Sequence, residues 1–376
     1  MNDLLKAYKT QIIIVCAAVF AFAFSACGDA SEFGAGAAGS SPTPEPAATE
    51  EVTSNLQPEA TPTNTPVPPA AGHIVFVSSR DGQMNLYSTS PDGAAVTRLT
   101  STASEDSDPR LSPDGSKVAF VSNLGGNTDI YVLDLISNLV TRVTDAPDKD
   151  SAPSWSPDGQ RLAFESFRDG NFEIYVTNID GSNQIRLTND PAGDNNPVWS
   201  PTSDEIVFTS NRFGNADLFL LNLNGTVDTL TTNPGPDNNP AWSPDGTRIA
   251  YQIFSSDVSQ ICLIDRFTKT QNCLTQNMDV YEAPVWSPNG LWLAVTSSQT
   301  ASITLFNTQD NSTMQIYQQG IEPRGEPAWS PDGLRLVFQA QVEGSLELFT
   351  ALVATNEVNR ITSVGGTNGS PLWTGQ

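Results

Sequence analysis

The chain has 376 residues, and its 42 acidic side chains outnumber its 18 basic ones to give a formal net charge of −24. This charge argues against nucleic acid or an anionic bilayer as the binding surface, and it favours either simple solvation or cationic partners, meaning basic peptide segments or metal ions. The single histidine, His73, leaves Ser-His-Asp, Cys-His and His-based metal sites without a plausible central residue, so we do not expect an enzyme.

Residues 1–27 have the features of a secretory signal. Lys6 and Lys9 precede an apolar run at residues 12–24, which is short for a membrane span of about 20 apolar residues. The small residues before Cys27 resemble a bacterial lipobox, whose Cys is lipidated and becomes the mature N-terminus. We therefore predict lipid attachment at Cys27, with an uncleaved membrane anchor or ordinary cleaved secretion as alternatives. All three place the rest of the chain outside the cytoplasm, and none decides which membrane is involved.

Residues 28–72 are predicted to form a disordered tether. The segment is rich in Gly and Ala at first and then in Pro, Thr and Glu, and it contains no Lys or Arg. It has too few large apolar groups to offset the entropy of ordering it. We therefore expect the N-terminal lipid to be the only contact with the membrane, and the tether to act as a spacer.

From residue 73 onward the phrase Pro-x-Trp-Ser-Pro-Asp-Gly recurs at intervals of 43 or 44 residues. Its aromatic position holds Trp155, Trp199, Trp242, Trp286, Trp329 and Trp373, with Leu111 in an earlier copy. A four-stranded β-propeller blade has about this length. In the copy that begins at Pro153, alternating apolar residues and turn residues predict strands near residues 153–156, 161–166, 173–177 and 185–188. We interpret the repeated Trp as packing between neighbouring blades.

The two ends of the repeat region predict how the ring closes. The first copy starts at the second strand of a blade, residues 73–78, and the chain finishes with a first strand at residues 371–374. If the C-terminal strand completes the first blade, both orphan strands are paired and two sheet edges disappear. The sequence therefore predicts an all-β, seven-bladed propeller of four-stranded blades over residues 73–376.

One repeat carries a family resemblance. Trp155-Ser156-Pro157-Asp158-Gly159, with Phe164, Gly170 and Ile174-Tyr175, resembles the repeat of the TolB-type, WD40-like propellers of bacterial envelopes. The resemblance covers residues 73–376 and implies an envelope protein that binds partner proteins around its propeller. TolB itself has an α/β domain before a six-bladed propeller, whereas the corresponding stretch of this chain is of low complexity. We therefore expect a relative of TolB and not its orthologue.

Two cysteines in the repeat region are predicted to form a disulfide. Cys262 and Cys273 are eleven residues apart, in the predicted third and fourth strands of one blade. Other blades have an aromatic residue and an Arg at these two positions, as in Tyr175 and Arg186, so antiparallel pairing should place the two positions opposite each other. An oxidising compartment favours the disulfide, and two buried free thiols are the alternative.

Four aspartates are the candidate site. Asp106, Asp150, Asp194 and Asp237 each stand three residues before the Pro of a predicted first strand. Four adjacent blades would then present an arc of carboxylates beside the channel mouth, which suits a cation such as Ca²⁺ or the basic end of a peptide. The alternative is structural, because Asp before such a strand commonly accepts backbone N–H groups.

Arginines in the neighbouring loops can neutralise some of these aspartates. Asp150 with Arg168 and Asp194 with Arg212 share a spacing of eighteen residues, which predicts ion pairs within blades. Asp106 and Asp237 have no Arg at the matching position. We therefore expect these two to be the freer carboxylates.

These features favour a lipid-anchored, extracytoplasmic and monomeric propeller that acts as a protein-binding or scaffolding module in the bacterial cell envelope. Its expected partners are envelope proteins or peptides with basic segments. A small-ligand or glycan receptor at the channel mouth is the alternative, and a carboxylate-based hydrolase is the less favoured one. No cofactor is expected, apart from a weak case for Ca²⁺.

Overall fold

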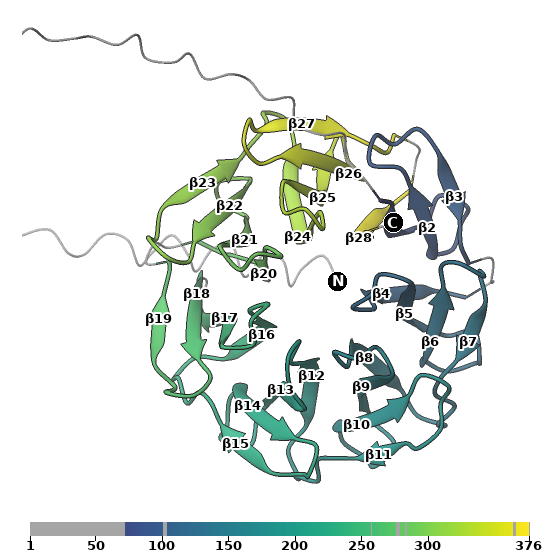
Figure 1. The fold of residues 1–376 in the computed structure, drawn as a ribbon, viewed down its shortest axis with the longest axis vertical. Coiled ribbons are helices and arrows are strands. Elements are labelled where there is room, and N and C mark those ends of the chain that lie inside the picture. The colour runs from purple at the N-terminus through teal and green to yellow at the C-terminus, as the bar shows by residue number, and fades with distance from the viewer. Residues whose placement is uncertain are drawn as a thin grey trace, which may run out of the picture. The chain divides into compact units, whose positions relative to one another are not determined.

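The structure is a computed structural model, and it describes residues 72–375 except 101–103, 257, 276–278, 283 and 364–365. The described residues form seven four-stranded antiparallel sheets, which stand as blades around a central channel (Figure 1). No helix in this part of the chain is long and apolar enough to cross a membrane. The all-β, seven-bladed fold predicted from the sequence is confirmed. The predicted signal peptide, the tether and Cys27 lie outside the described residues, apart from Gly72.

Each blade runs from an innermost strand beside the channel to an outermost strand at the rim. Blade 1 contains, in this order, β28 (Asn368–Trp373), β1 (Ile74–Ser78), β2 (Asn85–Thr89) and β3 (Val96–Arg98). Blade 2 contains β4 (Asp106–Leu111), β5 (Lys117–Ser122), β6 (Asp129–Asp134) and β7 (Val140–Arg142). Blade 3 contains β8 (Asp150–Trp155), β9 (Arg161–Ser166), β10 (Glu173–Asn178) and β11 (Ile185–Arg186). Blade 4 contains β12 (Asp194–Trp199), β13 (Glu205–Ser210), β14 (Asp217–Asn222) and β15 (Val227–Thr229).

The remaining three blades follow the same order. Blade 5 contains β16 (Asp237–Trp242), β17 (Arg248–Ser255), β18 (Val258–Asp265) and β19 (Gln271–Cys273). Blade 6 contains β20 (Val285–Trp286), β21 (Trp292–Ser297), β22 (Ser302–Asn307) and β23 (Thr313–Ile316). Blade 7 contains β24 (Glu322–Trp329), β25 (Arg335–Val342), β26 (Ser345–Leu352) and β27 (Glu357–Arg360).

The ring closes through blade 1, as the orphan strands predicted. β28 pairs antiparallel with β1, and Ile74 lies opposite Trp373. The backbone N–H of Thr374 donates to the carbonyl of His73 at 2.8 Å and extends this pairing by one residue. The C-terminal strand therefore removes the exposed edge that β1 would otherwise present.

The core lies between blades as well as within them. One buried cluster joins Ile130 of blade 2 to Trp155 and Phe164 of blade 3. Most of the repeated Trp side chains also donate their indole N–H across the junction: Trp155 to the carbonyl of Arg110 at 2.9 Å, and Trp242 to that of Val198 at 3.0 Å. These Trp side chains therefore fill the wedge between two sheets and tie their innermost strands together, whereas the indole N–H of Trp199 donates within its own blade to the carbonyl of Ser203 at 3.2 Å.

A β-bulge interrupts most innermost strands just before the repeated Pro. In blade 4 the register shifts between Asn195 and Val198, and Asn196 has a φ of 52°. Asn239 takes the same left-handed conformation in blade 5, with a φ of 51°. Asn tolerates this conformation better than most residues, and Pro has no N–H to lose from the ladder. The bulge turns this part of the strand toward the central channel.

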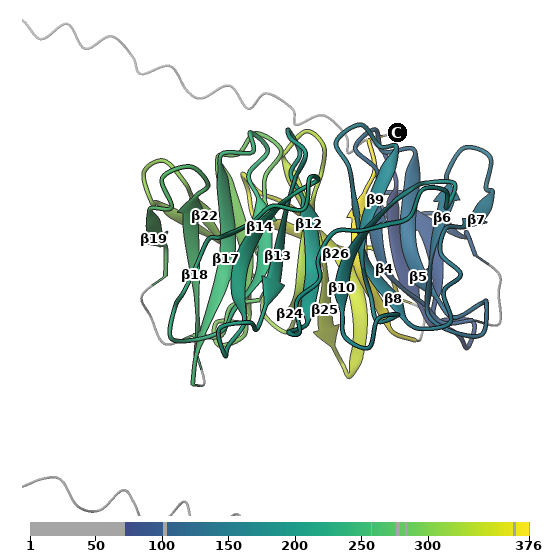
Figure 2. The ribbon, with the colours of Figure 1, turned by 90° about the horizontal axis from the view of Figure 1, so that it is seen from below.

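The ring has two different faces, seen edge-on in Figure 2. The start of each innermost strand lies opposite the end of the second strand, as in Asp106 opposite Ser122. The loops between blades and the loops between second and third strands therefore share one side, which we name the loop face. The Ser-Pro-Asp-Gly turns and the hairpins between third and fourth strands share the other side, which we name the turn face. His73, beside the end of β28, lies at the turn face.

Candidate functional site

The four candidate aspartates are buried, and they do not form an exposed arc. They are the first residues of β4, β8, β12 and β16, and no more than 1% of any of them is accessible to solvent. The expectation of an open acidic surface at these positions is therefore wrong, and the alternative structural interpretation describes them better.

Two of the aspartates form the ion pairs that the spacing of eighteen predicted. Arg168 donates through Nη2 to both carboxylate oxygens of Asp150, at 3.1 and 3.0 Å. Arg212 binds Asp194 in the same way, at 2.8 and 3.0 Å. Each guanidinium also lies over an aromatic ring of the third strand, with Arg168 4.6 Å from the ring centre of Tyr175. These arginines thus neutralise a buried charge and pack on the blade.

Asp106 is not free either, although it has no Arg. Thr100, at the end of the preceding blade, donates to its carboxylate at 2.6 Å, and Ser122 donates at 2.7 Å. Burial raises the pKa of Asp106, while these hydroxyl groups oppose the increase. The expectation that Asp106 and Asp237 are available to a ligand is corrected, because both are closed off by protein. Asp237 has fewer partners, of which Asn233 is one at 2.8 Å.

Sequence reasoning missed a second row of buried acids at the start of the third strands. Glu173 receives hydrogen bonds from Arg186 at 2.7 Å and from the hydroxyl of Thr188 at 2.6 Å. The same hydroxyl accepts the backbone N–H of Ile174 at 2.9 Å. Asp129 with Arg142 and Glu347 with Arg360 repeat the ion pair, at 2.6 and 3.0 Å. The signal was available, since an acid recurs thirteen residues before the Arg in these blades.

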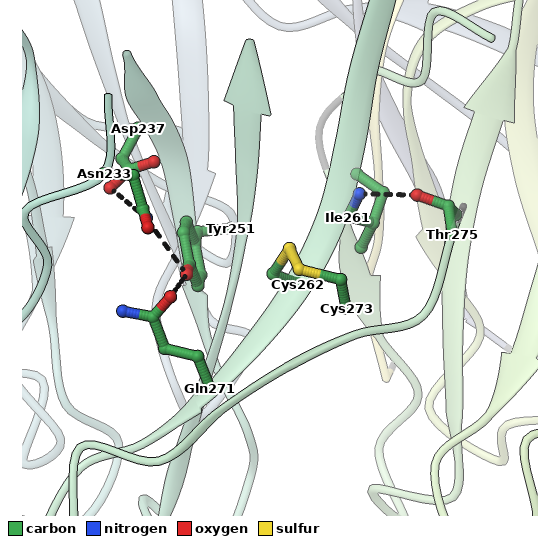
Figure 3. Close-up of a disulfide and its surroundings, with 8 residues drawn as sticks. All are labelled: Asn233, Asp237, Tyr251, Ile261, Cys262, Gln271, Cys273 and Thr275. Atoms are coloured by element: carbon green, nitrogen blue, oxygen red, sulfur yellow. Dashed lines mark hydrogen bonds between the residues drawn. A yellow bond between two sulfur atoms is a disulfide. The ribbon is translucent and has the colours of Figure 1, made fainter. Parts of the chain in front are cut away.

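The structure joins Cys262 and Cys273 by a disulfide (Figure 3). The two residues lie directly opposite each other in the pairing of β18 with β19. Tyr175 lies opposite Arg186 in the corresponding pairing of blade 3. The disulfide thus occupies the position of the aromatic–Arg pairs found in other blades and ties the outermost strand to its sheet.

The central channel contains a cavity of about 420 Å³. Proline rings of several blades line it together with Asn196 and Asn239 of the bulges, and Arg110 and Glu326 add charge. Arg110 contacts Asp108 at 2.9 Å and Glu326 at 3.4 Å. Burial lowers the pKa of the Arg110 guanidinium, but the two carboxylates outweigh burial and hold the pKa above its usual value.

Sequence reasoning did not select Arg110. It occupies the x position of Pro-x-Trp, where the other blades have Ser154, Val198, Ala241, Val285, Ala328 and Leu372. A charged residue at a position that is otherwise small or aliphatic was the available signal. The carboxylate of Glu326, the guanidinium of Arg110 and the amides of Asn196 and Asn239 can offer both donors and acceptors to a ligand in the channel.

The loop face carries large exposed apolar side chains on three successive blades. Leu124, Phe167 and Phe213 are 49%, 41% and 60% exposed, and each follows a second strand. Loops that contain acidic residues lie beside them. The backbone N–H of Glu105 donates to the side chain of Asn123, next to Leu124, and the backbone N–H of Phe167 donates to the carbonyl of Lys149, which follows Asp148. Near Phe213, Asp190 lies 3.9 Å from the adjacent Arg212.

A metal centre finds no support in the described residues. Across that part of the chain, no three His, Cys, Asp or Glu side chains are grouped so that they could hold a metal ion. The four candidate aspartates lie in separate blades and bind their own partners. The weak case for Ca²⁺ that rested on an arc of carboxylates therefore loses its geometric basis.

Comparison with solved structures supports the fold. The chain resembles TolB from Acinetobacter baumannii, with 22% sequence identity and a TM-score of 0.55, and the match covers 81% of this chain and 66% of that one. It also resembles an oligogalacturonate lyase in complex with manganese, at 16% identity and a TM-score of 0.63, over 75% of this chain and 86% of that one. Likenesses at these identities concern the fold alone.

A third solved structure is the β-propeller domain of the Trilobed protease from Pyrococcus furiosus, at 15% identity and a TM-score of 0.59, over 79% of this chain and 96% of that one. No curated protein matches the chain. The family described as the TolB beta propeller domain matches residues 50–150, 130–239 and 227–376. These matches cover most of the chain, including all seven blades, and so the chain belongs to the TolB β-propeller family.

Proposed function

We propose that this protein is a lipid-anchored, extracytoplasmic propeller of the bacterial envelope that binds partner proteins through its loop face. Membership of the TolB family and the lipobox-like sequence at Cys27 support the location. One observation carries the binding role, namely the exposed Leu124, Phe167 and Phe213 beside acidic loops. Exposed large apolar side chains rimmed by polar residues mark interaction sites.

The chemistry of this surface indicates the kind of partner. Apolar side chains give an interface most of its affinity, while charges around them select partners and steer their approach. Glu105, Asp145 and Asp148 are exposed on loops of the same face. The partner would therefore present apolar anchors next to basic side chains, as an envelope protein with a basic segment would.

The experiment is affinity capture of the full-length tagged protein from its native envelope after mild crosslinking. The test variant carries Leu124→Ser, Phe167→Ser and Phe213→Ser. The matched control carries Ile136→Ser, Leu139→Ser and Phe267→Ser, which removes three large and still more exposed apolar side chains from hairpins of the turn face. Both variants should fold, because exposed apolar residues contribute little to the core.

We expect the wild type and the turn-face control to capture the same envelope proteins, and the loop-face variant to lose them. Loss in the control alone would place the binding surface on the turn face and contradict the proposal. Equal capture by all three proteins would show that neither set of apolar side chains binds, and a scaffold that works through these residues would be ruled out.

A second candidate is a receptor for a small hydroxyl-rich ligand or glycan in the central channel. The observation that favours it is the cavity of about 420 Å³ with Arg110, Glu326 and the amides of Asn196 and Asn239 on its wall. Sites of 300–1,000 Å³ typically hold small ligands, and mixed donors and acceptors suit hydroxyl groups. Calorimetric titration with neutral mono- and disaccharides tests this candidate separately from protein capture.

A further inference from the structure

The junction between blades 4 and 5 differs from that between blades 3 and 4 because it buries two acids that pair with no cation among the described residues. Asp217 begins β14 and Asp237 begins β16, and both are at least 99% buried. At the next junction toward the N-terminus, the equivalent Glu173 and Asp194 each bind an Arg. The two junctions share the same repeated backbone, so the difference between them comes from the residues at equivalent positions.

Three substitutions within the repeat remove the compensation. Thr229 lies opposite Phe219, where Arg186 lies opposite Tyr175 in blade 3, so Asp217 has no Arg. Ile253 lies opposite Asp237, where a Ser lies opposite the aspartate in blades 2, 3 and 4. Ser255 stands two residues after Ile253, at the position of the aspartate-binding Arg in blades 3 and 4.

The two acids are close enough to influence each other. Asn233 links them, since its side-chain amide donates to Asp237 at 2.8 Å and its backbone N–H donates to Asp217. The backbone N–H of Asp237 donates to the carbonyl of Ala216, the residue before Asp217, at 2.7 Å. Each carboxylate also keeps one buried oxygen, Oδ1, that has no hydrogen-bond partner within the described structure.

The groups that face Asp237 cannot neutralise it. Asp217 comes from β14 and Tyr251 from β17, and Asn233 contacts the hydroxyl of Tyr251 at 3.5 Å, which in turn donates to Gln271 at 3.0 Å (Figure 3). Arg212, from the second-to-third-strand loop of blade 4, is engaged by Asp194. Burial raises the pKa of Asp237 to about 6; the charge of Asp217 adds to the increase, and hydrogen bonds from Thr231 and Asn233 oppose it.

We infer that the junction between blades 4 and 5 is a proton-sensitive seam, closed when Asp237 is protonated and weakened when Asp237 and Asp217 are both ionised. Protonation of one carboxyl removes the repulsion between two buried charges. When Asp237 loses the proton, no cation among the described residues of the seam neutralises its carboxylate. The inference concerns the stability of this junction, and it does not depend on the proposed function.

The sign of the pH effect follows from linkage. The folded-state pKa of Asp237 lies above its ordinary value of 3.8, so the folded protein binds the proton more tightly than the unfolded chain. Its contribution to stability is therefore fully present below the ordinary pKa and is lost as the pH rises through about 6. Between pH 5 and pH 7.5 the unfolding equilibrium constant should increase about tenfold through this residue alone.

The test compares urea unfolding of the full chain at pH 5 and pH 7.5 for the wild type, Asp237→Asn and the matched control Asp150→Asn. The amide of Asp237→Asn carries no charge at either pH, so this variant should lack the tenfold increase. The control removes a carboxylate that already has an Arg, and it should destabilise at both pH values while keeping the wild-type pH dependence. Equal pH dependence in the wild type and Asp237→Asn would overturn the inference.

Two further measurements keep the inference testable should Asp237→Asn fail to fold. Thr229→Arg restores the arginine of the other blades next to Asp217, and it should reduce the pH dependence and slow amide exchange in β16 at pH 7.5 relative to the wild type. Unchanged exchange in β16 would count against the seam. Calcium chloride is the remaining probe: stabilisation at pH 7.5 that disappears in Asp237→Asn would mean that the seam holds a cation, and the proton would then not be the switch.

Discussion

At the scale of single residues, Arg110 separates ligand binding from stability. Its side chain is 41% exposed, and its partners Asp108 and Glu326 are 32% and 47% exposed. Ion pairs with this much solvent contact contribute about 1 kcal/mol or less, so Arg110→Ala should leave the free energy of unfolding nearly unchanged. If the channel binds a hydroxyl-rich ligand, the same change should reduce the affinity about tenfold, because it removes several donors.

Titration calorimetry with any saccharide that binds the wild type, together with urea unfolding, measures both effects. Lys269→Ala is the control, since it breaks the surface pair with Asp228 far from the channel wall. Unchanged affinity in Arg110→Ala would contradict a ligand site at this arginine. A large loss of stability would instead show that Arg110 holds the ring together.

Single residues are also where sequence reasoning was least complete. A constant spacing of eighteen predicted the pairs of Asp150 and Asp194 with their arginines, because a repeat preserves relative positions. It did not reveal that hydroxyl groups of Thr100 and Ser122 satisfy Asp106. Those groups come from a neighbouring blade and a neighbouring strand, and a Ser or Thr is too common for its sequence position to identify such a contact. The absence of an Arg therefore did not make a carboxylate free.

At the scale of elements, the disulfide of blade 5 should stabilise the outermost hairpin. Cys262 lies in β18 and Cys273 in β19, and β19 is only three residues long. Closing so short a loop contributes roughly 3 kcal/mol or less. Replacing both cysteines by Ser should therefore lower the free energy of unfolding by up to this amount and should speed amide exchange in β19 and not in β11, which has no disulfide.

The comparison is made by urea unfolding and hydrogen exchange on oxidised wild type and on the double variant. Reduced wild type is the control, and it should resemble the variant. If reduction and substitution leave exchange in β19 unchanged, the hairpin is held by its backbone ladder alone, and the disulfide adds nothing to this element.

Strands and hairpin registers were predictable because alternation and turn residues repeat in every blade. The bulges were not foreseen, although the Pro of the repeat is their signal, since a residue without an N–H fits where the ladder is interrupted. Asn196 and Asn239, two residues of these bulges, line the channel cavity. The residues of the channel wall were therefore not predicted, because the irregular strand pairing at the bulges was not predicted.

At the scale of the whole molecule, the number of blades and their closure followed from counting complete and incomplete repeats. The interaction surface did not, because exposure depends on which loops cover which side chains. Phe213 and Phe208 are both apolar residues of one blade, yet one is 60% exposed and the other is fully buried. Sequence alone cannot separate such residues without the positions of the neighbouring blades.

Closure by β28 should decide whether the ring holds, and removing residues 367–376 tests it. The deletion takes away Trp373, which packs with Ile74 and Phe76 of blade 1 and with Val337 of blade 7 in one buried cluster. Losing a buried Trp alone costs about 3–5 kcal/mol, and β1 would also become an exposed edge. We expect the truncated chain to unfold at lower urea and to associate through this edge in size-exclusion chromatography.

A peptide of residues 367–375 added in trans should restore both properties, since it carries the missing strand and its Trp. The same peptide with Trp373→Ala is the control, and it should pair weakly because the backbone ladder remains while the wedge between blades 7 and 1 stays empty. Full stability without the strand would show that six complete blades and a three-stranded one hold the ring unaided. Rescue by the wild-type peptide alone would assign closure to the Trp wedge more than to the ladder.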